Sequence, residues 1–222
     1  MGRGLFITGT DTDVGKTYVT ALLVKTLRSA GYDVGYYKAA ISGARTVEES
    51  DAGFVNRFAQ IREPEDMLLS YLYQNAVSPH LAARIEGNPV EKDVIMSAWE
   101  RVTAAYPYVT MEGSGGIMCP IRHDEKAVYY LEDIIRWLRL PVLVIADAGL
   151  GTINRVVTTC EYIRRRNISV KGIILNHWKG GVMEEDNAEM IEEITGGKVL
   201  ARVKRGDTEL DIDPETIISL YE

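Results

Sequence analysis

One stretch near the N-terminus limits what this chain can fold into. The short apolar segment Leu5-Phe6-Ile7 is followed by Gly9-Thr10-Asp11-Thr12-Asp13-Val14-Gly15-Lys16-Thr17, where an amphipathic segment begins. A strand, a glycine-containing loop and a helix in this order are typical of a phosphate-binding loop. The unpaired N–H groups at a helix start, and the positive end of the helix dipole, attract anionic oxygens. The stretch therefore predicts a nucleoside triphosphate site.

The spacing within this loop is irregular. The common pattern G-x-x-x-x-G-K-[ST] requires glycine at position 10, but Thr10 stands there and Gly9 lies one residue earlier. Gly15 would let the backbone approach the phosphates, Lys16 would reach the β- and γ-phosphates, and the Thr17 hydroxyl could ligate magnesium. The alternative is a glycine-rich turn before an ordinary helix.

Length and charge exclude several classes of partner. At 222 residues, the chain is long enough for a full core, and we expect residues 1–222 to form one domain. The net charge of −7 gives no electrostatic footprint for nucleic acid or an anionic membrane. No secretion signal and no apolar run of about 20 residues is evident, so a cytoplasmic protein is expected. Cys119 and Cys160 form no metal or redox motif, and free buried thiols are favoured over a disulfide.

Apolar runs alternate with segments of helical period along the rest of the chain. Strands are expected at residues 3–8, 33–37, 108–111, 141–146, 170–175 and 198–203. Helices are expected at 15–30, near 51, from 78, and at 91–105, 130–139, 153–166 and 184–195, which makes the middle third mostly helical. This order predicts an α/β fold like that of P-loop NTPases, with a mostly parallel sheet covered by helices on both faces.

Ligands of such sheets bind beyond the carboxyl ends of the strands, so the residues that follow each strand are candidates for one site. Lys38 ends a buried strand, where an ammonium group is costly unless it meets an anion or reaches solvent at the strand tip. Glu112 is the best second magnesium ligand beside Thr17. Asp51 is a third candidate, or else a solvated acid at a helix start. Lys16 and Lys38 together would stabilise the charge that develops in phosphoryl transfer.

The segment from Gly149 to Asn154 opens a helix after the most apolar strand. Its free N–H groups could hold a second anion such as a substrate carboxylate. A simple N-cap by Thr152 is favoured by the sequence alone. His80 could be structural or line a pocket, whereas His123 and His177 look incidental by themselves.

A series of motifs in chain order resembles the dethiobiotin synthetase family. They are the loop at residues 9–17, Tyr-Lys-x-x-x-Ser-Gly at 37–43, Ser-Asp at 50–51, Ser-Pro-His at 78–80, Glu-Gly-x-Gly-Gly at 112–116 and Leu-Gly-x-Ile-Asn at 150–154. The resemblance runs in register from residue 3 to about residue 180. It implies a ligase that takes 7,8-diaminononanoate, carbon dioxide (as bicarbonate) and ATP. A carbamate forms on one amine, the γ-phosphate activates it, and the second amine closes the ring.

The resemblance also implies roles for particular residues. Lys38 and Lys16 would be catalytic, and Mg²⁺ would be held by Thr17, Asp51 and Glu112. The diamine or its carbamate would contact Thr12, Lys38 and Ser42. The substrate's carboxylate tail would bind at Gly151, Thr152, Ile153 and Asn154 across a two-fold interface, which implies a homodimer. Contacts to the nucleotide would come from Asp13, Val14, Gly15, Lys16, Thr17, Tyr18, Asp51, Glu112, Gly113, Ser114, Gly115, Asn176, His177, Val203, Lys204 and Arg205.

The chain departs from the family pattern at three places. Asp13 stands where glutamate is expected, and Ala39-Ala40-Ile41 follows Lys38 where a proline is expected. Val203-Lys204-Arg205-Gly206 replaces the usual Ile-Pro-aromatic segment near the nucleobase, which leaves the identity of the base open. The alternative function is that of a ParA- or MinD-like partitioning ATPase. Such proteins carry an extra lysine early in the loop and often a basic surface or a membrane helix, and this chain has neither signal. A cobyrinate amidase would need a glutaminase domain, for which the chain has no room.

Overall fold

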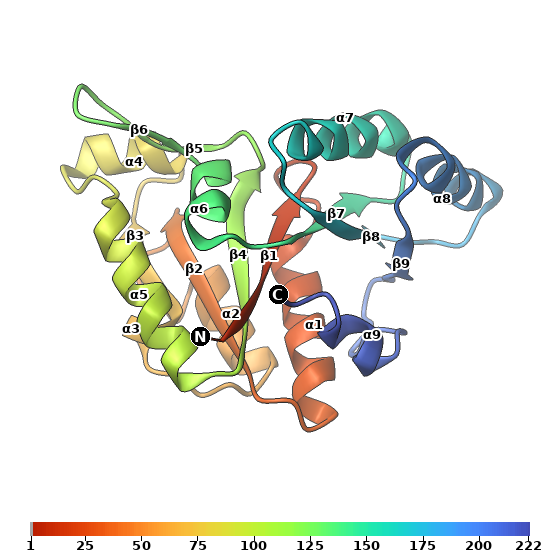
Figure 1. The fold of residues 1–222 in the computed structure, drawn as a ribbon, viewed down its shortest axis with the longest axis horizontal. Coiled ribbons are helices and arrows are strands. Elements are labelled where there is room, and N and C mark those ends of the chain that lie inside the picture. Colours follow the sequence, from red (N-terminus) through yellow and green to blue (C-terminus); the bar gives the residue numbers. More distant parts are fainter. Residues whose placement is uncertain (1) are drawn as a thin grey trace.

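The structure is a computed structural model that describes residues 2–222. Its main feature is a sheet of seven strands in the order β3-β2-β4-β1-β7-β8-β9, in which every neighbouring pair is parallel (Figure 1). The strands are β1 (Arg3–Gly9), β2 (Val34–Ser42), β3 (Leu69–Tyr73), β4 (Tyr108–Gly116), β7 (Val142–Asp147), β8 (Val170–Asn176) and β9 (Val199–Arg202). The parallel α/β architecture expected from the alternation of apolar strands and helices is confirmed.

Helices cover both faces of this sheet. They are α1 (Lys16–Ser29), α2 (Asp51–Phe58), α3 (Glu65–Leu68), α4 (Pro79–Glu86), α5 (Lys92–Ala105), α6 (Leu131–Leu138), α7 (Thr152–Arg164), α8 (Val182–Thr195) and α9 (Pro214–Ile218). Alternate residues of a strand point to opposite faces. On β2, Lys38 meets Asp51 at the start of α2, while Tyr37 packs against Trp99 of α5 at 6.4 Å between ring centroids.

Strand β2 is longer than the sequence analysis predicts. The prediction places Lys38 at the end of the strand, whereas β2 continues to Ser42 because its second half pairs with β3, from Lys38↔Leu69 to Ser42↔Tyr73. Strand β3 itself was not expected in a middle third predicted to be mostly helical. Its short sequence, Leu-Ser-Tyr-Leu-Tyr, alternates buried with half-buried side chains, as an edge strand does. Lys38 therefore lies inside a strand and not at its tip.

Two further elements were not predicted. A hairpin of β5 (Pro120–His123) and β6 (Val128–Tyr130) forms a separate antiparallel pair, and the short helix α9 follows β9. These strands have three or four residues, too few for a periodic pattern to be read. Cys119 and Cys160 are both free thiols, as expected. Within residues 2–222, no helix is both long and apolar enough to cross a membrane.

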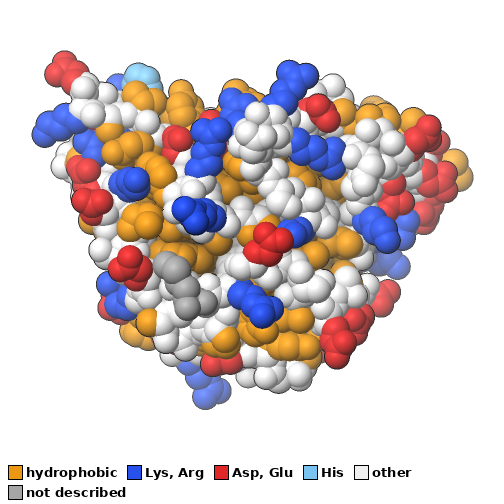
Figure 2. Space-filling model, in the orientation of Figure 1, with side chains coloured by type: hydrophobic (Ala, Val, Ile, Leu, Met, Phe, Trp, Pro, Cys, Tyr) orange, Lys and Arg blue, Asp and Glu red, His pale blue; other side chains and the backbone are white. Residues whose placement is uncertain are grey.

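Charged side chains of both signs are interspersed on the face of the molecule drawn in Figure 2. Acidic groups gather mainly at the edge where α8 lies (Figure 2). That helix carries an acidic sequence, Val-Met-Glu-Glu-Asp-Asn-Ala-Glu-Met-Ile-Glu-Glu-Ile-Thr. Part of the net charge of −7 is therefore concentrated on one helix, while the sheet is covered by a mixed surface.

The last two residues close the core beneath β1. The Gly4 N–H donates to the carbonyl of Glu222 at 2.7 Å, and the Glu222 N–H donates to the carbonyl of Gly4 at 3.2 Å. The buried Tyr221 hydroxyl lies 2.6 Å from the hydroxyl of Thr110 on β4. Its ring also meets that of Tyr108 edge-on, with 5.8 Å between centroids.

We predict that Tyr221→Ala will lower the free energy of unfolding by about 3–5 kcal/mol, because it empties an aromatic site in the core and leaves the Thr110 hydroxyl unpaired. Urea unfolding followed by circular dichroism would measure the change. The control is Val182→Ala, at a side chain that is 89% exposed, which should change stability by less than about 0.5 kcal/mol. Equal effects of the two substitutions would contradict this account.

Candidate active site

The phosphate-binding loop occupies residues 10–15, between β1 and α1. Gly15 is the N-cap of α1 in a left-handed conformation with φ 80°, and no side chain caps the helix. A Cβ at this position would lie 2.1 Å from Nδ2 of Asn176, which donates to the carbonyl of Val14 at 3.0 Å. Only glycine satisfies both the conformation and the space. The loop thus leaves N–H groups at the start of α1 available to an anion.

The irregular position of Gly9 has a steric cause. A Cβ on Gly9 would lie 2.8 Å from the carbonyl oxygen of Asp11 and 2.9 Å from Cδ of Lys16. The Lys16 side chain folds back over the loop, and its Nζ donates to that same carbonyl at 3.1 Å. The close approach that excludes a side chain therefore falls at position 9. The Thr10 N–H instead continues the sheet by donating to the carbonyl of Ile145 at 2.9 Å.

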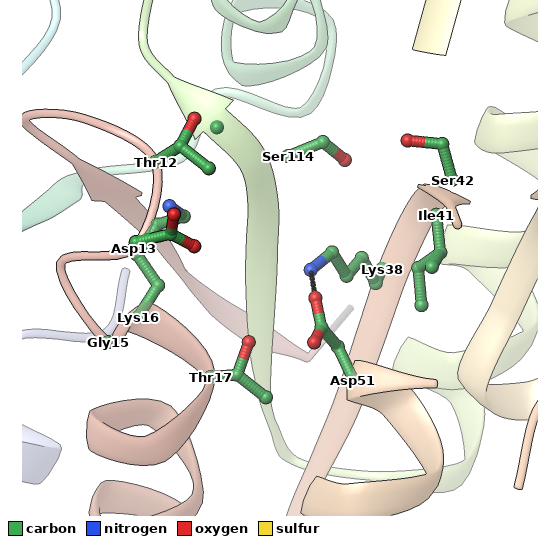
Figure 3. Close-up of a pocket in the computed structure, with 11 residues that line it drawn as sticks. Thr12, Asp13, Gly15, Lys16, Thr17, Lys38, Ile41, Ser42, Asp51 and Ser114 are labelled. Carbon is green, nitrogen blue, oxygen red and sulfur yellow. Dashed lines mark hydrogen bonds and ion pairs between the residues drawn. The ribbon is translucent and has the colours of Figure 1, made fainter. Parts of the chain in front are cut away.

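A cleft of about 260 Å³ opens beside this loop (Figure 3). It is lined by residues from the loop, α1, β2, α2 and β4, namely Thr12, Asp13, Gly15, Lys16, Thr17, Lys38, Ile41, Ser42, Asp51, Ser114 and Gly115. The cleft brings together the residues that the sequence associated with phosphate and metal and those that it associated with the second substrate. Of the residues that follow strands, those of the loop and Lys38 line the cleft, whereas Glu112 and Asn176 contact lining residues without lining it themselves.

Lys38 is the centre of the site. Its Nζ donates to Oδ2 of Asp51 at 2.5 Å and to Oε1 of Glu112 at 2.8 Å (the Asp51 contact is drawn in Figure 3). The side chains of Lys38 and Glu112 are 4% and 0% exposed, whereas that of Asp51 is about half exposed. Burial alone would lower the pKa of Lys38, but the charges of Glu112 and Asp51 outweigh it and raise that pKa above its usual value. The ammonium therefore remains charged.

The same carboxylates shape the rest of the electrostatics. Burial would raise the pKa of Asp51, but the adjacent Lys38 ammonium lowers it below its usual value. Burial, and secondly the charge of Lys38, lower the pKa of Lys16. Two ammonium groups, of Lys16 and Lys38, thus lie in one cleft. Such an arrangement favours binding of a polyanion.

Three side chains that could ligate a metal ion through oxygen lie near the Lys38 ammonium, namely those of Thr17, Asp51 and Glu112. The Thr17 hydroxyl donates to Oε1 of Glu112 at 2.8 Å, and the same oxygen accepts from Lys38. The Asp51 carboxylate is the third group, because its Oδ2 accepts from the same Lys38 ammonium. One hydroxyl and two carboxylates are hard oxygen ligands of the kind that Mg²⁺ prefers. The residues predicted to hold magnesium therefore form a fitting donor set.

Several predicted nucleotide contacts lie outside this cleft. Val14 is buried, and Tyr18 turns its hydroxyl to the carbonyl of Asp207. Gly113 lies against Phe6, so that a Cβ there would approach the ring to 2.9 Å. Glu112 is buried behind the cleft, where its side chain meets Thr17 and Lys38.

The remaining predicted nucleotide contacts follow β8 and β9. Asn176 touches the loop at Val14, as described above. His177 has a left-handed backbone with φ 58°, and its Nδ1 lies 2.7 Å from Oδ2 of Asp147. Val203 is buried and extends the pairing of β9 with β8, because its N–H donates to the carbonyl of Leu175 at 2.8 Å. Lys204 and Arg205 are exposed.

The start of α7 is built differently from the capping pattern favoured above. Gly151, with φ 85°, is the N-cap, so the prediction that Thr152 caps the helix is wrong. Thr152 is the first residue of the helix, and its hydroxyl is buried without a partner in the described part of the chain. Gly151 and Asn154 are exposed and Ile153 is half-buried, and none of these residues lines the cleft beside Lys38.

One side chain that contacts the site was missed by the sequence analysis. Tyr36 donates from its hydroxyl to Oε2 of Glu112 at 3.2 Å. The alternation of β2 contained a signal for Tyr36, since residues two apart on a strand share a face with Lys38.

The fold is shared with known nucleotide-binding proteins. An AAA-domain family matches residues 3–208. A ParA family ATPase from Chlorobium tepidum superposes with a TM-score of 0.58 and 12% identity, over 99% of this chain and 90% of that one. The MinC:MinD cell division complex of Aquifex aeolicus gives 0.55 and 15%, over 91% of this chain and 81% of that one. At these identities the likeness concerns the fold alone. Together with the loop geometry, it defines an AAA-domain protein of the P-loop NTPase class.

Relatives of higher sequence identity show the family to which the chain belongs within this class. The ATP-dependent dethiobiotin synthetase BioD of Brachyspira hyodysenteriae is 48% identical over the full length of both chains. That of Clostridium kluyveri is 42% identical over 92% of this chain and 86% of its own length. The chain belongs to the ATP-dependent dethiobiotin synthetase family.

We predict that Gly15→Ala will weaken ATP binding by at least about tenfold, because the displaced loop loses charge-assisted hydrogen bonds of about 1.5–3 kcal/mol each. Isothermal titration calorimetry would measure the affinity. Gly31→Ala is the matched control, since Gly31 follows the other end of α1 with φ 90° but has no atom within 4 Å of the added Cβ. Both variants carry backbone strain, so loss of ATP binding in both would contradict the steric explanation.

Proposed function

We propose that this protein is an ATP-dependent dethiobiotin synthetase that forms the ureido ring of dethiobiotin from 7,8-diaminononanoate, carbon dioxide and ATP. One amine takes up carbon dioxide as a carbamate, and the γ-phosphate is transferred to a carbamate oxygen. The second amine then attacks the activated carbon and expels phosphate, which leaves ADP as the other product. The observation that carries the proposal is the buried Lys38 ammonium held between Glu112 and Asp51, in the same cleft as Lys16 and the phosphate-binding loop.

This reaction requires concentrated positive charge in the active site. Carbamate and triphosphate are both anions, and they repel each other unless fixed cations lie between them. Lys16 would contact the transferring phosphate, and Lys38 would stabilise the carbamate and the charge that develops on transfer. Because its pKa is raised, Lys38 would act as a fixed cation and not as a base.

The donor set of Thr17, Asp51 and Glu112 would hold Mg²⁺. When bound, the ion would neutralise phosphate charge and orient the nucleotide. The protein's own part is to fix these three side chains, which come from α1, α2 and β4, around one point.

The second substrate would lie between the loop and the end of β2. Thr12 and Ser42 line the cleft on either side and could donate hydrogen bonds to the carbamate or diamine. Asn176 lies at the loop on the side of β8, where it could contact the base. The start of α7, residues 151–154, would bind the carboxylate tail of a substrate held by a second protomer. Analytical ultracentrifugation would measure the oligomeric state. A protein that is a monomer at a concentration at which it is fully active would contradict this dimer.

A direct assay tests the proposed function. The protein is mixed with MgATP, bicarbonate and 7,8-diaminononanoate, and ADP and dethiobiotin are measured by mass spectrometry. We expect both products in equal amounts and only when the diamine is present. ATP turnover that does not depend on the diamine, with no ring-closed product, would refute the synthetase and favour a nucleotide switch. A panel of other nucleoside triphosphates would show whether residues 203–206 select adenine. Cell fractionation would test the cytoplasmic location that forms part of the proposal.

We predict that Lys38→Met will reduce kcat by at least about 100-fold, because a preorganised charge is lost from the transition state. ATP affinity should change only a few-fold, since the loop and Lys16 remain. Single-turnover product formation and calorimetry measure the two quantities separately. Lys198→Met, at an exposed lysine on the way into β9, should leave both unchanged. Undiminished turnover in the Lys38 variant would remove Lys38 from its catalytic role.

A further inference from the structure

We propose that Tyr36 is a positioning residue that fixes the Glu112 carboxylate for binding of the metal ion. This inference rests on the proposed magnesium site and adds to it a residue that contacts neither substrate nor metal. Tyr36 lies on β2 two residues before Lys38, and it is 1% exposed. The only hydrogen bond that its side chain makes among residues 2–222 joins its hydroxyl to Oε2 of Glu112, at 3.2 Å.

The two oxygens of Glu112 have different partners. Oε1 accepts from the Thr17 hydroxyl and from the Lys38 ammonium, each at 2.8 Å. Oε2 accepts from Tyr36, and no other donor reaches it in the described chain. The Tyr36 hydroxyl therefore holds Oε2 away from Thr17 and Lys38, so that together with their bonds to Oε1 it fixes which oxygen faces the other proposed metal ligands.

Burial makes this contact consequential. The Glu112 side chain is 0% exposed, so water cannot replace a donor that is removed. Groups that orient a metal ligand in this way commonly change metal affinity 10- to 100-fold when they are removed.

The neighbouring Tyr37 separates this role from simple packing. Tyr37 is also fully buried on β2, but it points to the opposite face, and its hydroxyl lies 2.6 Å from Oγ of Ser70. Tyr36→Phe and Tyr37→Phe remove the same atom from adjacent residues of one strand. A general weakening of β2 would affect both variants alike, whereas loss of carboxylate orientation would affect only the first.

The test is binding of Mn²⁺, as a probe for Mg²⁺, to the protein–ADP complex by electron paramagnetic resonance. We expect Tyr36→Phe to weaken Mn²⁺ binding by about tenfold, and Tyr37→Phe to leave it within about twofold of the wild type. Glu112→Gln should also weaken it, and Tyr36→Phe should add nothing further in the Glu112→Gln background, because Tyr36 acts through that carboxylate. Mn²⁺ binding that Tyr36→Phe leaves unchanged, or weakens equally in both backgrounds, would overturn the inference.

Two further measurements apply if Glu112→Gln does not weaken Mn²⁺ binding or if Tyr36→Phe does not fold. If Glu112→Gln binds Mn²⁺ like the wild type, the proposed metal site itself is wrong, and the dethiobiotin assay then tests the proposed function independently. If Tyr36→Phe does not fold, 3-fluorotyrosine at position 36 keeps the ring and the hydroxyl. Its ¹⁹F resonance should shift when MgADP is added to the wild-type background but not in Glu112→Gln. The same response in both backgrounds would overturn the inference.

Discussion

The ion pairs of Lys38 are the interaction on which the site depends. A buried ammonium group on a strand is unfavourable unless carboxylates meet it, and even a paired buried charge contributes little net stability compared with apolar packing. The protein nevertheless places Lys38 opposite Glu112 in the register of β2 with β4, and brings Asp51 to it at the start of α2. This cost is understandable if the charge serves a ligand. The parallel pairing, the extra length of β2 and the position of α2 all serve to hold one cation in place.

A second set of contacts, at the phosphate-binding loop, connects the two halves of the sheet. The loop belongs to β1 and α1, but Asn176 at the end of β8 holds its Val14 carbonyl, and Asp147 at the end of β7 holds His177 beside it. Gly15 is the point of closest approach between these parts. The loop conformation is thus determined by a strand far away in the sequence as well as by its own glycines.

Much of the fold and part of the candidate site could be predicted from the sequence because the signals were local and periodic. The loop motif, the apolar strands and the amphipathic helices gave the α/β architecture, and the strand-end rule gathered Lys16, Lys38 and Glu112 into one region. Strand β3 was missed because five residues at an edge carry a weak pattern. The contact of Tyr36 with Glu112 was missed because a tyrosine in a strand normally indicates core packing. The cap of α7 was misassigned because Thr152 has good capping chemistry, yet Gly151 alone adopts the left-handed turn without strain.

The central position of β1 has a consequence for how the chain folds. Strand β1 ends at Gly9, but its hydrogen-bonded neighbours are β4, which begins at Tyr108, and β7, which begins at Val142. These pairings close long loops, whose entropy must be lost before the contacts repay it, and such topologies fold slowly. The phosphate-binding loop follows β1, and it takes its final place only when β4 and β7 have joined that strand in the sheet. A nucleotide can therefore stabilise the finished fold by mass action, but cannot act as a template for its first steps.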